Sequence, residues 1–189
     1  MTARLPFEPP DDCPHCPRLV AFRRDNRAAE PDWFNAPVPG FGGHDGRLLI
    51  VGLAPGLRGA NRTGRPFTGD YAGDLLYPTL GAFGFARGTY GQRPDDGLAL
   101  VDARLTNAVR CVPPANKPVG KEIATCNPFL AAEIAAMAKL EAILALGRIA
   151  HDAVLRALGL RIAAHRFGHG NRHELGCGRR LYDSYHCSR

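Results

Sequence analysis

Short apolar runs, separated by longer segments of mixed polarity, recur along this chain of 189 residues. The run at 48–53, Leu-Leu-Ile-Val-Gly-Leu, is followed by a turn at Pro-Gly. It predicts a buried strand, because strands covered on both faces are continuously apolar. Similar but less distinct runs predict strands at 105–109, 142–146, 161–167 and 180–185.

Apolar residues at helical spacing fill most of the intervals between these runs. They predict helices at 16–24, 72–83, 127–140 and 148–158. The third of these is expected to start with Asn127 as its N-cap and Pro128 in the first turn, where a missing N–H is tolerated. Strands that alternate with helices predict an α/β domain with a mostly parallel central sheet.

Polar segments follow several of the predicted strands, at 52–70, 107–116 and 186–188. Ligands of open parallel sheets bind beyond the carboxyl ends of the strands, so we expect these segments to converge on one cleft. The segment 52–56, Gly-Leu-Ala-Pro-Gly, is not a nucleotide loop, because neither GxxxxGK[ST] nor GxGxxG occurs in the chain.

Composition places the chain among globular proteins. Apolar residues make up 45% and charged residues 22% of it, which is unlike disordered or coiled-coil sequences. No apolar run is long enough to cross a bilayer, and the N-terminus lacks the apolar segment of a signal peptide. We therefore expect a cytoplasmic protein with no membrane partner.

Positive charge is concentrated toward the C-terminus. The formal net charge is +6, and residues 147–189 contain eight Arg, no Lys and three acidic residues. Clustered cations favour a polyanionic partner such as nucleic acid. A solvated, Arg-rich surface explains the same charge equally well.

Six cysteines occur in a chain without an export signal, so we do not interpret them as disulfides. Cys13 and Cys16 form a CxxC pair that places two thiolates on one turn. Cys111 and Cys126 are isolated and are able to complete a four-thiolate site for zinc or an iron–sulfur cluster. The spacing does not choose between the two metals.

The segment 59–70, Gly-Ala-Asn-Arg-Thr-Gly-Arg-Pro-Phe-Thr-Gly-Asp, combines glycines that allow close approach with the flat ring of Phe67 and the carboxylate of Asp70. Together with the CxxC pair, Gly-Leu-Ala-Pro-Gly at 52–56, Leu-Thr-Asn-Ala-Val-Arg-Cys at 105–111, Cys126 and His186, it resembles the uracil-DNA glycosylase superfamily. The resemblance is greatest to the type B (family 5) branch, which is near the iron–sulfur family 4 branch.

This resemblance implies a three-layer αβα fold with a central four-stranded, mostly parallel sheet. Residues 1–189 would form a single domain with an N-terminal iron–sulfur-binding segment. The implied protein is a monomeric, monofunctional enzyme of base excision repair. It would flip a deaminated base, namely uracil and also hypoxanthine or xanthine, out of double-stranded or single-stranded DNA and hydrolyse its N-glycosidic bond, leaving an abasic site.

The resemblance also implies roles for individual residues. Asp70 would orient or activate water, Asn107 would contact the base or the water, and His186 would donate toward a base carbonyl oxygen. The substrate-binding set would be Gly52, Leu53, Ala54, Pro55, Gly56, Asn61 and Phe67, with Phe67 stacking on the base. The DNA contacts would be Arg62, Arg65, Arg110 and Arg189. The ligands of a [4Fe–4S] cluster, or of zinc as the alternative, would be Cys13, Cys16, Cys111 and Cys126.

Some alternatives stay open. Asp70 is also a plausible helix N-cap, and His186 a plausible structural residue. His165, His169 and His173 have the spacing of a helical zinc site, but the glycines at 168 and 170 argue against a helix there. In the family, a segment that enters the minor groove follows the histidine motif, whereas this chain stops at Arg189. Either the chain is truncated or the segment is missing, and the second case favours a non-catalytic DNA-binding or damage-sensing protein.

Overall fold

A mostly parallel sheet forms the centre of the computed structural model, which describes residues 7–187. Its strands are β1 (Phe41–Gly42), β2 (Leu48–Gly52), β5 (Ala103–Asn107), β6 (Ala142–Leu146), β7 (Arg172–Glu174) and β8 (Arg180–Ser184). Their order is β1-β5-β2-β6-β8-β7, with parallel pairing from β5 through β8 and antiparallel pairing at both edges. The predicted core of four parallel strands is confirmed, with one short antiparallel strand added at each edge.

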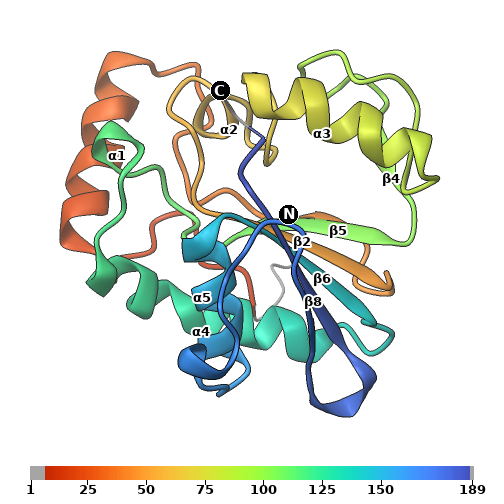
Figure 1. Ribbon diagram of the computed structural model, residues 1–189. Helices are drawn as coiled ribbons and strands as arrows, with labels where there is room; N and C mark the ends of the chain where they lie inside the picture. Colours follow the sequence, from red (N-terminus) through yellow and green to blue (C-terminus); the bar gives the residue numbers. More distant parts are fainter. Residues whose placement is uncertain (1–6, 188–189) are drawn as a thin grey trace.

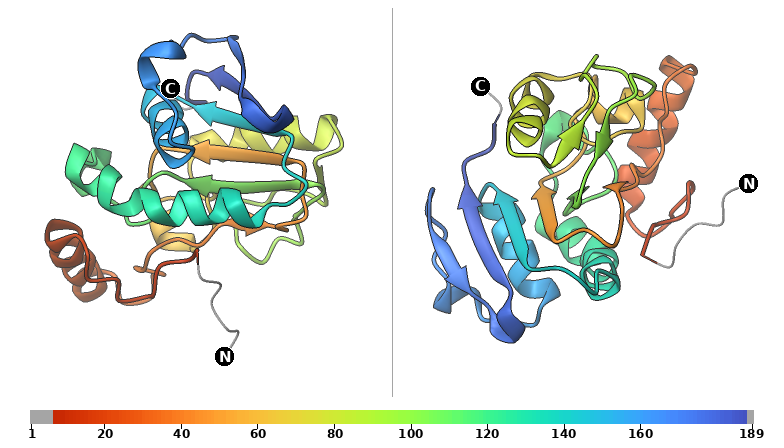
Figure 2. Two further views of the ribbon diagram at one scale, coloured as in Figure 1. Left: turned by 90° about the horizontal axis from the view of Figure 1, so that it is seen from below. Right: turned by 90° about the vertical axis from the view of Figure 1, so that its right-hand side faces the viewer.

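Helices cover both faces of the sheet (Figures 1 and 2). The α-helices are α1 (Pro17–Ala29), α2 (Ala60–Thr63), α3 (Tyr71–Ala82), α4 (Gly120–Ala136) and α5 (Arg148–Ala157). The smaller elements are a two-stranded sheet of β3 (Ala86–Arg87) and β4 (Ala99–Leu100), and 3₁₀ turns at Pro114–Asn116, Ile162–Ala164 and Gly176–Gly178. Helix α3 lies on one face, and α4 and α5 lie on the other, so the predicted three-layer αβα fold is confirmed.

Alternating residues of β2 divide the core into two parts. Leu49 and Val51 pack with residues of α4 and α5, whereas Ile50 packs with residues of α3. This alternation follows from the period of two along a strand. Each fully buried side chain of this size contributes about 1.5–3 kcal/mol through removal from water. The two apolar clusters therefore fix β2, and with it the position of the turn that follows.

Two sequence-based expectations about elements were wrong. Helix α4 begins at Gly120 and not at Asn127, so Pro128 lies inside it. The carboxylate of Glu122 accepts a hydrogen bond from the Val119 N–H (2.9 Å) and thereby caps the true start. Residues 161–167 do not form a strand; they contain the short 3₁₀ turn Ile162–Ala164. Helices and turns in the described part of the chain include none that is long and apolar enough to span a membrane.

A buried ion network joins the N-terminal segment to the sheet. Arg104 and Arg110 each contact both Glu8 and Glu133, at N–O distances of 2.5–3.0 Å. Glu133 is completely buried, and Arg110 is 1% exposed. The prediction that Arg110 contacts DNA phosphates is therefore wrong, because its guanidinium is enclosed and paired inside the protein.

Candidate active site

The ends of three parallel strands meet at one edge of the sheet. Gly52 ends β2 and is paired with Asn107 at the end of β5, and His186 follows two residues after β8 ends at Ser184. Parallel strands bring their carboxyl ends to the same edge, so the turn after β2 faces the segments that leave β5 and β8. The structure brings the three predicted polar segments together.

Asn107 and Phe67 both lie close to Gly52. A Cβ atom added to Gly52 would lie 2.5 Å from Asn107 Oδ1 and 2.5 Å from Phe67 Cζ. Only glycine allows the amide and the ring to approach this closely. Asn107 is buried, and its Oδ1 atom lies next to Gly52. It is therefore a polar group able to read a ligand.

The ring of Phe67 stacks on His186, with ring centroids 5.8 Å apart and an interplanar angle of 26°. Partial desolvation lowers the pKa of the His186 imidazole, and the nearby Asp70 carboxylate opposes this shift. The neutral ring is therefore favoured, and a neutral imidazole carries one N–H for donation to a ligand oxygen.

Asp70 occupies the N-cap position of α3, as the structural alternative predicted, but its side chain makes no capping hydrogen bond. Its Oδ1 atom is buried and has no hydrogen-bond partner within the described residues. Oδ2 lies against a glycine turn, where a Cβ on Gly59 would approach it to 2.3 Å and a Cβ on Gly56 to 3.1 Å. Burial raises the pKa of Asp70, an effect that the backbone N–H groups of Gly73 and Ala72 partly offset.

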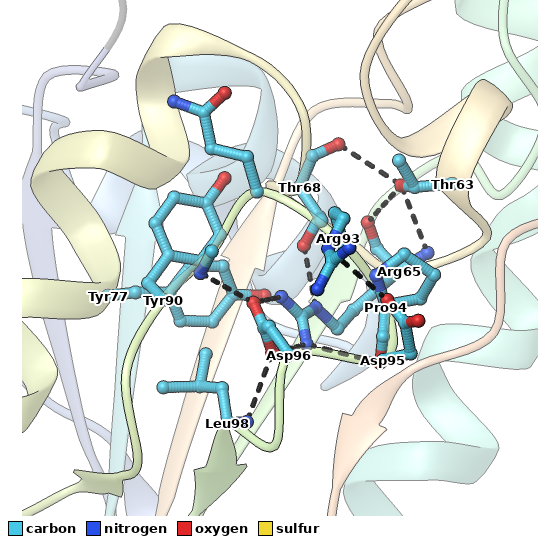
Figure 3. Close-up of polar contacts among 12 residues, drawn as sticks. Thr63, Arg65, Thr68, Tyr77, Tyr90, Arg93, Pro94, Asp95, Asp96 and Leu98 are labelled. Atoms are coloured by element: carbon cyan, nitrogen blue, oxygen red, sulfur yellow. Dashed lines mark hydrogen bonds and ion pairs between the residues drawn. The ribbon is translucent and has the colours of Figure 1, made fainter.

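Arg65 supports the turn that carries Phe67, and Figure 3 shows its contacts with Asp96 and Thr68. The guanidinium of Arg65 donates to both carboxylate oxygens of Asp96, at 2.8 and 2.7 Å, and Nε donates to Thr68 Oγ1 at 2.7 Å. It also lies 5.4 Å from the ring centre of Tyr77 and 5.9 Å from that of Tyr90. Arg65 is 5% exposed, so the prediction that it contacts DNA is wrong.

The two tyrosines beside Arg65 also fix the backbone around Phe67. The hydroxyl of Tyr77 donates to the Pro66 carbonyl (2.6 Å), and that of Tyr90 donates to the Phe67 carbonyl (3.2 Å). Phe67 has φ = +51°, a left-handed conformation that is unfavourable for a non-glycine residue. Its neighbours hold it there, which places the ring beside Gly52.

The remaining predicted contacts have mixed outcomes. Asn61 is buried and donates from Nδ2 to Asn35 Oδ1 at 2.8 Å, which joins the glycine turn to the N-terminal segment; its contact with substrate stays a prediction. Residues 53–56 form the turn after β2, as predicted. Arg62 is exposed and stays a predicted DNA contact, and Arg189 lies outside the described residues.

A cavity near α1 and α4 is lined by all four cysteines of the predicted metal site, Cys13, Cys16, Cys111 and Cys126. Arg23 Nη1 donates to Cys111 Sγ at 3.6 Å, and the Arg110 N–H donates to Cys126 Sγ at 3.4 Å. Burial raises the pKa of Cys111 to about 12 and that of Cys126 to about 11. The thiols are not among the groups in residues 7–187 whose ligand atoms all lie within 4.8 Å of one another.

Most of the chain matches a known protein family. The sequence profile of the Uracil DNA glycosylase superfamily matches residues 39–189. The chain belongs to this superfamily. It is 47% identical to the Type-5 uracil-DNA glycosylase of Thermus thermophilus over 94% of this chain and 83% of that protein. It is 45% identical to the Type-5 enzyme of Mycobacterium tuberculosis over 93% of this chain and 69% of that protein.

The similarity to the type-4 branch is lower. The Type-4 uracil-DNA glycosylase of Pyrobaculum aerophilum is 37% identical over 79% of this chain and 63% of its own length. The predicted membership in the type-5 branch of the uracil-DNA glycosylases, near type 4, is therefore confirmed.

Asp96, Tyr77 and Tyr90 support the site and were not identified from the sequence. Asp96 is 31 positions away from Arg65, and no motif joins the two. The only available signal was the combination of a glycine-rich loop with an acidic pair, Asp95-Asp96, before a predicted strand. That signal is too weak to assign a partner.

Proposed function

We propose that this chain is a monofunctional DNA glycosylase that removes deaminated bases from DNA and leaves abasic sites. The proposal rests on the arrangement of Phe67, Asp70, Asn107 and His186 around the glycine at position 52. The ring of Phe67 and the amide of Asn107 lie beside Gly52, the imidazole of His186 stacks on Phe67, and Asp70 offers a buried acceptor atom that has no partner in the described chain. A base inside a duplex cannot reach such a site, so its nucleotide must be extruded.

Departure of the base is aided by His186. When the N-glycosidic bond breaks, its electron pair stays on the base, and negative charge grows on a ring carbonyl oxygen. A neutral imidazole N–H aimed at that oxygen stabilises the charge without needing to reorganise. The lowered pKa of His186 suits this role, because the neutral ring is retained across the neutral pH range. Phe67 stacks on the base, and Asn107 hydrogen-bonds its edge or the attacking water.

Asp70 is assigned to direct the attack of water on the sugar. The sugar gains oxocarbenium character as the base leaves, and a carboxylate stabilises this positive charge. The unpartnered Oδ1 of Asp70 is able to accept a hydrogen bond from water and direct its oxygen toward the anomeric carbon. The water then supplies the hydroxyl group of the abasic sugar, and its proton passes to the carboxylate or to solvent.

The proposed substrates are uracil and also hypoxanthine or xanthine in double-stranded or single-stranded DNA. Leu53 and Ala54 in the first turn are apolar, so the pocket has few polar groups that a mismatched base would leave unpaired. Arg62 is exposed next to the glycine turn and is proposed to contact a phosphate. We propose a cytoplasmic monomer as the acting species.

We further propose that Cys13, Cys16, Cys111 and Cys126 hold a [4Fe–4S] cluster, with zinc as the alternative. The donor set fits, because the four thiols line one cavity and N–H groups are directed at two of the sulfurs. Tetrahedral zinc would bring the sulfurs within about 4 Å of one another, closer than the thiols are gathered here. When bound, the cluster would supply structural cross-linking of the N-terminal segment, the end of β5 and α4.

A panel of duplexes that contain uracil, hypoxanthine or xanthine tests the function. After incubation with excess protein, alkali cleaves any abasic site, and strand breaks report base removal. We expect breaks at uracil and slower breaks at the deaminated purines. Binding to the duplex without any break would support the damage-sensing alternative and refute catalysis.

The metal is tested separately on the purified protein. We expect a brown preparation with broad visible absorption, together with iron and acid-labile sulfide, and loss of both in Cys111→Ser. The matched control is Cys187→Ser, whose thiol lies near α3, away from the cavity. Stoichiometric zinc without iron would support the alternative.

A further inference from the structure

A buried histidine–aspartate cluster lies directly before the segment that carries His186. His151 Nδ1 lies 2.6 Å from Asp183 Oδ1, and His173 Nε2 lies 2.9 Å from Asp183 Oδ2. The side chains of His151 and Asp183 are completely buried. Asp183 is in β8, only three positions before His186. No step of the proposed reaction uses this cluster.

The distances identify the cluster as a hydrogen-bonded network and not as a metal site. Two ligands of one tetrahedral ion at ordinary bond lengths are about 3.3 Å apart, which is longer than either contact of Asp183. His151 Nε2 lies 2.7 Å from the His165 carbonyl, and a carbonyl only accepts, so Nε2 carries a proton. Asp183 is thus paired through Oδ1 with His151 and through Oδ2 with His173, and Oδ2 also accepts a hydrogen bond from the Gly168 N–H at 3.1 Å.

These contacts fasten the 165–171 segment to the end of β8. The Asp183 N–H donates to the Asn171 carbonyl at 3.0 Å, and the Gly170 N–H donates to the Asp183 carbonyl at 2.9 Å. The fastened segment contains His169, whose Nδ1 accepts a hydrogen bond from the Tyr185 N–H at 3.1 Å. The rings of His169 and Tyr185 also stack, with centroids 4.8 Å apart and planes 9° apart.

We propose that Asp183 and His169 are positioning residues for the glycosylase reaction: the Asp183 cluster fixes the 165–171 segment, and His169 from this segment holds the backbone at Tyr185 so that His186 stays stacked on Phe67. The inference rests on the proposed function, because it assigns a role relative to His186. A displacement of His186 by about 1 Å would weaken its donation to the base, and misplacements of this size cost roughly 10- to 100-fold in rate.

Two substitutions at His169 distinguish the effect of its hydrogen bond with the Tyr185 N–H from the effect of its stacking on the Tyr185 ring. His169→Phe keeps a flat ring but lacks the acceptor, whereas the side-chain oxygen of His169→Asn is able to replace Nδ1. We expect roughly a tenfold loss of the single-turnover rate at saturating protein for His169→Phe, and recovery of most of it for His169→Asn. Affinity for a uracil-free duplex should be the same in both. Equal rates in the two variants, or a loss confined to DNA affinity, would overturn the proposal.

Asp183→Asn tests the cluster itself, with Asp152→Asn in the neighbouring helix α5 as the matched control. Hydrogen exchange followed by mass spectrometry should show faster exchange over 184–187 and 165–171 in Asp183→Asn only. This readout does not depend on catalysis. Unchanged exchange overturns the inference, whereas a wild-type chain inactive on every base, with exchange as expected, refutes the proposed function alone.

Discussion

Two regions of this protein bury polar groups, and they differ in whether these groups have hydrogen-bond partners. Around Arg65, every polar atom of the guanidinium and of Asp96 has a partner (Figure 3). The rings of Phe41, Tyr77 and Tyr90 also lie against the guanidinium. At the strand ends, Asp70 Oδ1 is buried and has no partner in the described chain. Satisfied groups build a rigid support, and unsatisfied groups are kept available for a ligand.

The pKa shifts of the two carboxyl groups show the same contrast. The Arg65 guanidinium holds the pKa of Asp96 well below its usual range, whereas burial raises the pKa of Asp70. Asp96 therefore stabilises the folded state in its charged form, whereas ionisation of Asp70 costs stability. This pattern is expected at a reaction site, where an energetically costly buried charge is retained and a neighbouring network of paired charges stabilises the fold.

Replacement of Asp70 should have the largest effect on activity. In Asp70→Asn the side chain keeps its shape but no longer carries the charge that orients water, so we expect roughly a 1,000-fold loss of the single-turnover rate on a uracil duplex. Affinity for uracil-free DNA should be unchanged. The matched control is Asp74→Asn, one turn further along α3 and exposed. A rate within a few-fold of the wild type would remove the role assigned to Asp70.

Replacement of Asp96 should have the largest effect on stability. Asp96→Asn leaves the Arg65 charge buried without its counter-ion, which we expect to lower the free energy of unfolding by about 3 kcal/mol. Chemical denaturation measures this difference. The neighbouring Asp95→Asn serves as control, since Asp95 forms only an exposed ion pair with Arg93 and should change stability by less than about 1 kcal/mol. Equal losses of unfolding free energy in Asp96→Asn and Asp95→Asn would contradict the stabilising role of the buried pair.

An added methyl group at Gly52 should block the site without unfolding the protein. In Gly52→Ala the Cβ would lie 2.5 Å from both Asn107 Oδ1 and Phe67 Cζ, so these groups must move. We expect roughly a 100-fold loss of rate. Gly120→Ala, where a Cβ meets nothing within 4 Å, should keep wild-type activity. Crystallographic or kinetic evidence that Gly52→Ala binds and processes uracil normally would show that the space is not used.

The smallest expected effect is on thermal stability, to which the carboxylates of Asp70 and Asp96 contribute with opposite signs. The folded-state pKa of Asp70 is raised, so its protonated form favours folding below the unfolded pKa, and that contribution is lost as pH rises through the folded pKa. At pH 7, Asp70→Asn should therefore raise Tm slightly. The Asp96 pKa is depressed, so its contribution is present above the unfolded pKa and is lost on acidification. Scanning calorimetry that finds Asp70→Asn less stable than the wild type would contradict this assignment.

Much of the fold was predictable because short apolar runs mark central strands. The runs at 48–53, 142–146 and 180–185 correspond to β2, β6 and β8, and the rule for strand ends predicted where polar segments converge. The start of α4 was not predictable from Asn127-Pro128, because the Asn127 amide donates to the Ala153 carbonyl (2.8 Å) in α5 and caps nothing. Tertiary packing decided the use of that side chain.

Assignment of the arginines was less successful. Arg65 and Arg110 resemble phosphate contacts in sequence, but their carboxylate partners lie 31 and 23 positions away, respectively, in Asp96 and Glu133. Charge pattern alone does not show such distant pairs. The cluster of His151, His173 and Asp183 was missed for the same reason, because its members are distant in sequence. The spacing of His165, His169 and His173 suggested a different group of histidines.

Release of free uracil from a uracil-containing duplex, measured by mass spectrometry under protein excess, tests the central claim most directly. If the strand ends hold an extruded base beside Phe67 and His186 while Asp70 directs water, the wild-type chain releases stoichiometric uracil, and the strand stays intact until alkali is added. Asp70→Asn releases almost none on the same timescale. A wild-type chain that binds the duplex and releases no base would contradict the assignment of this site.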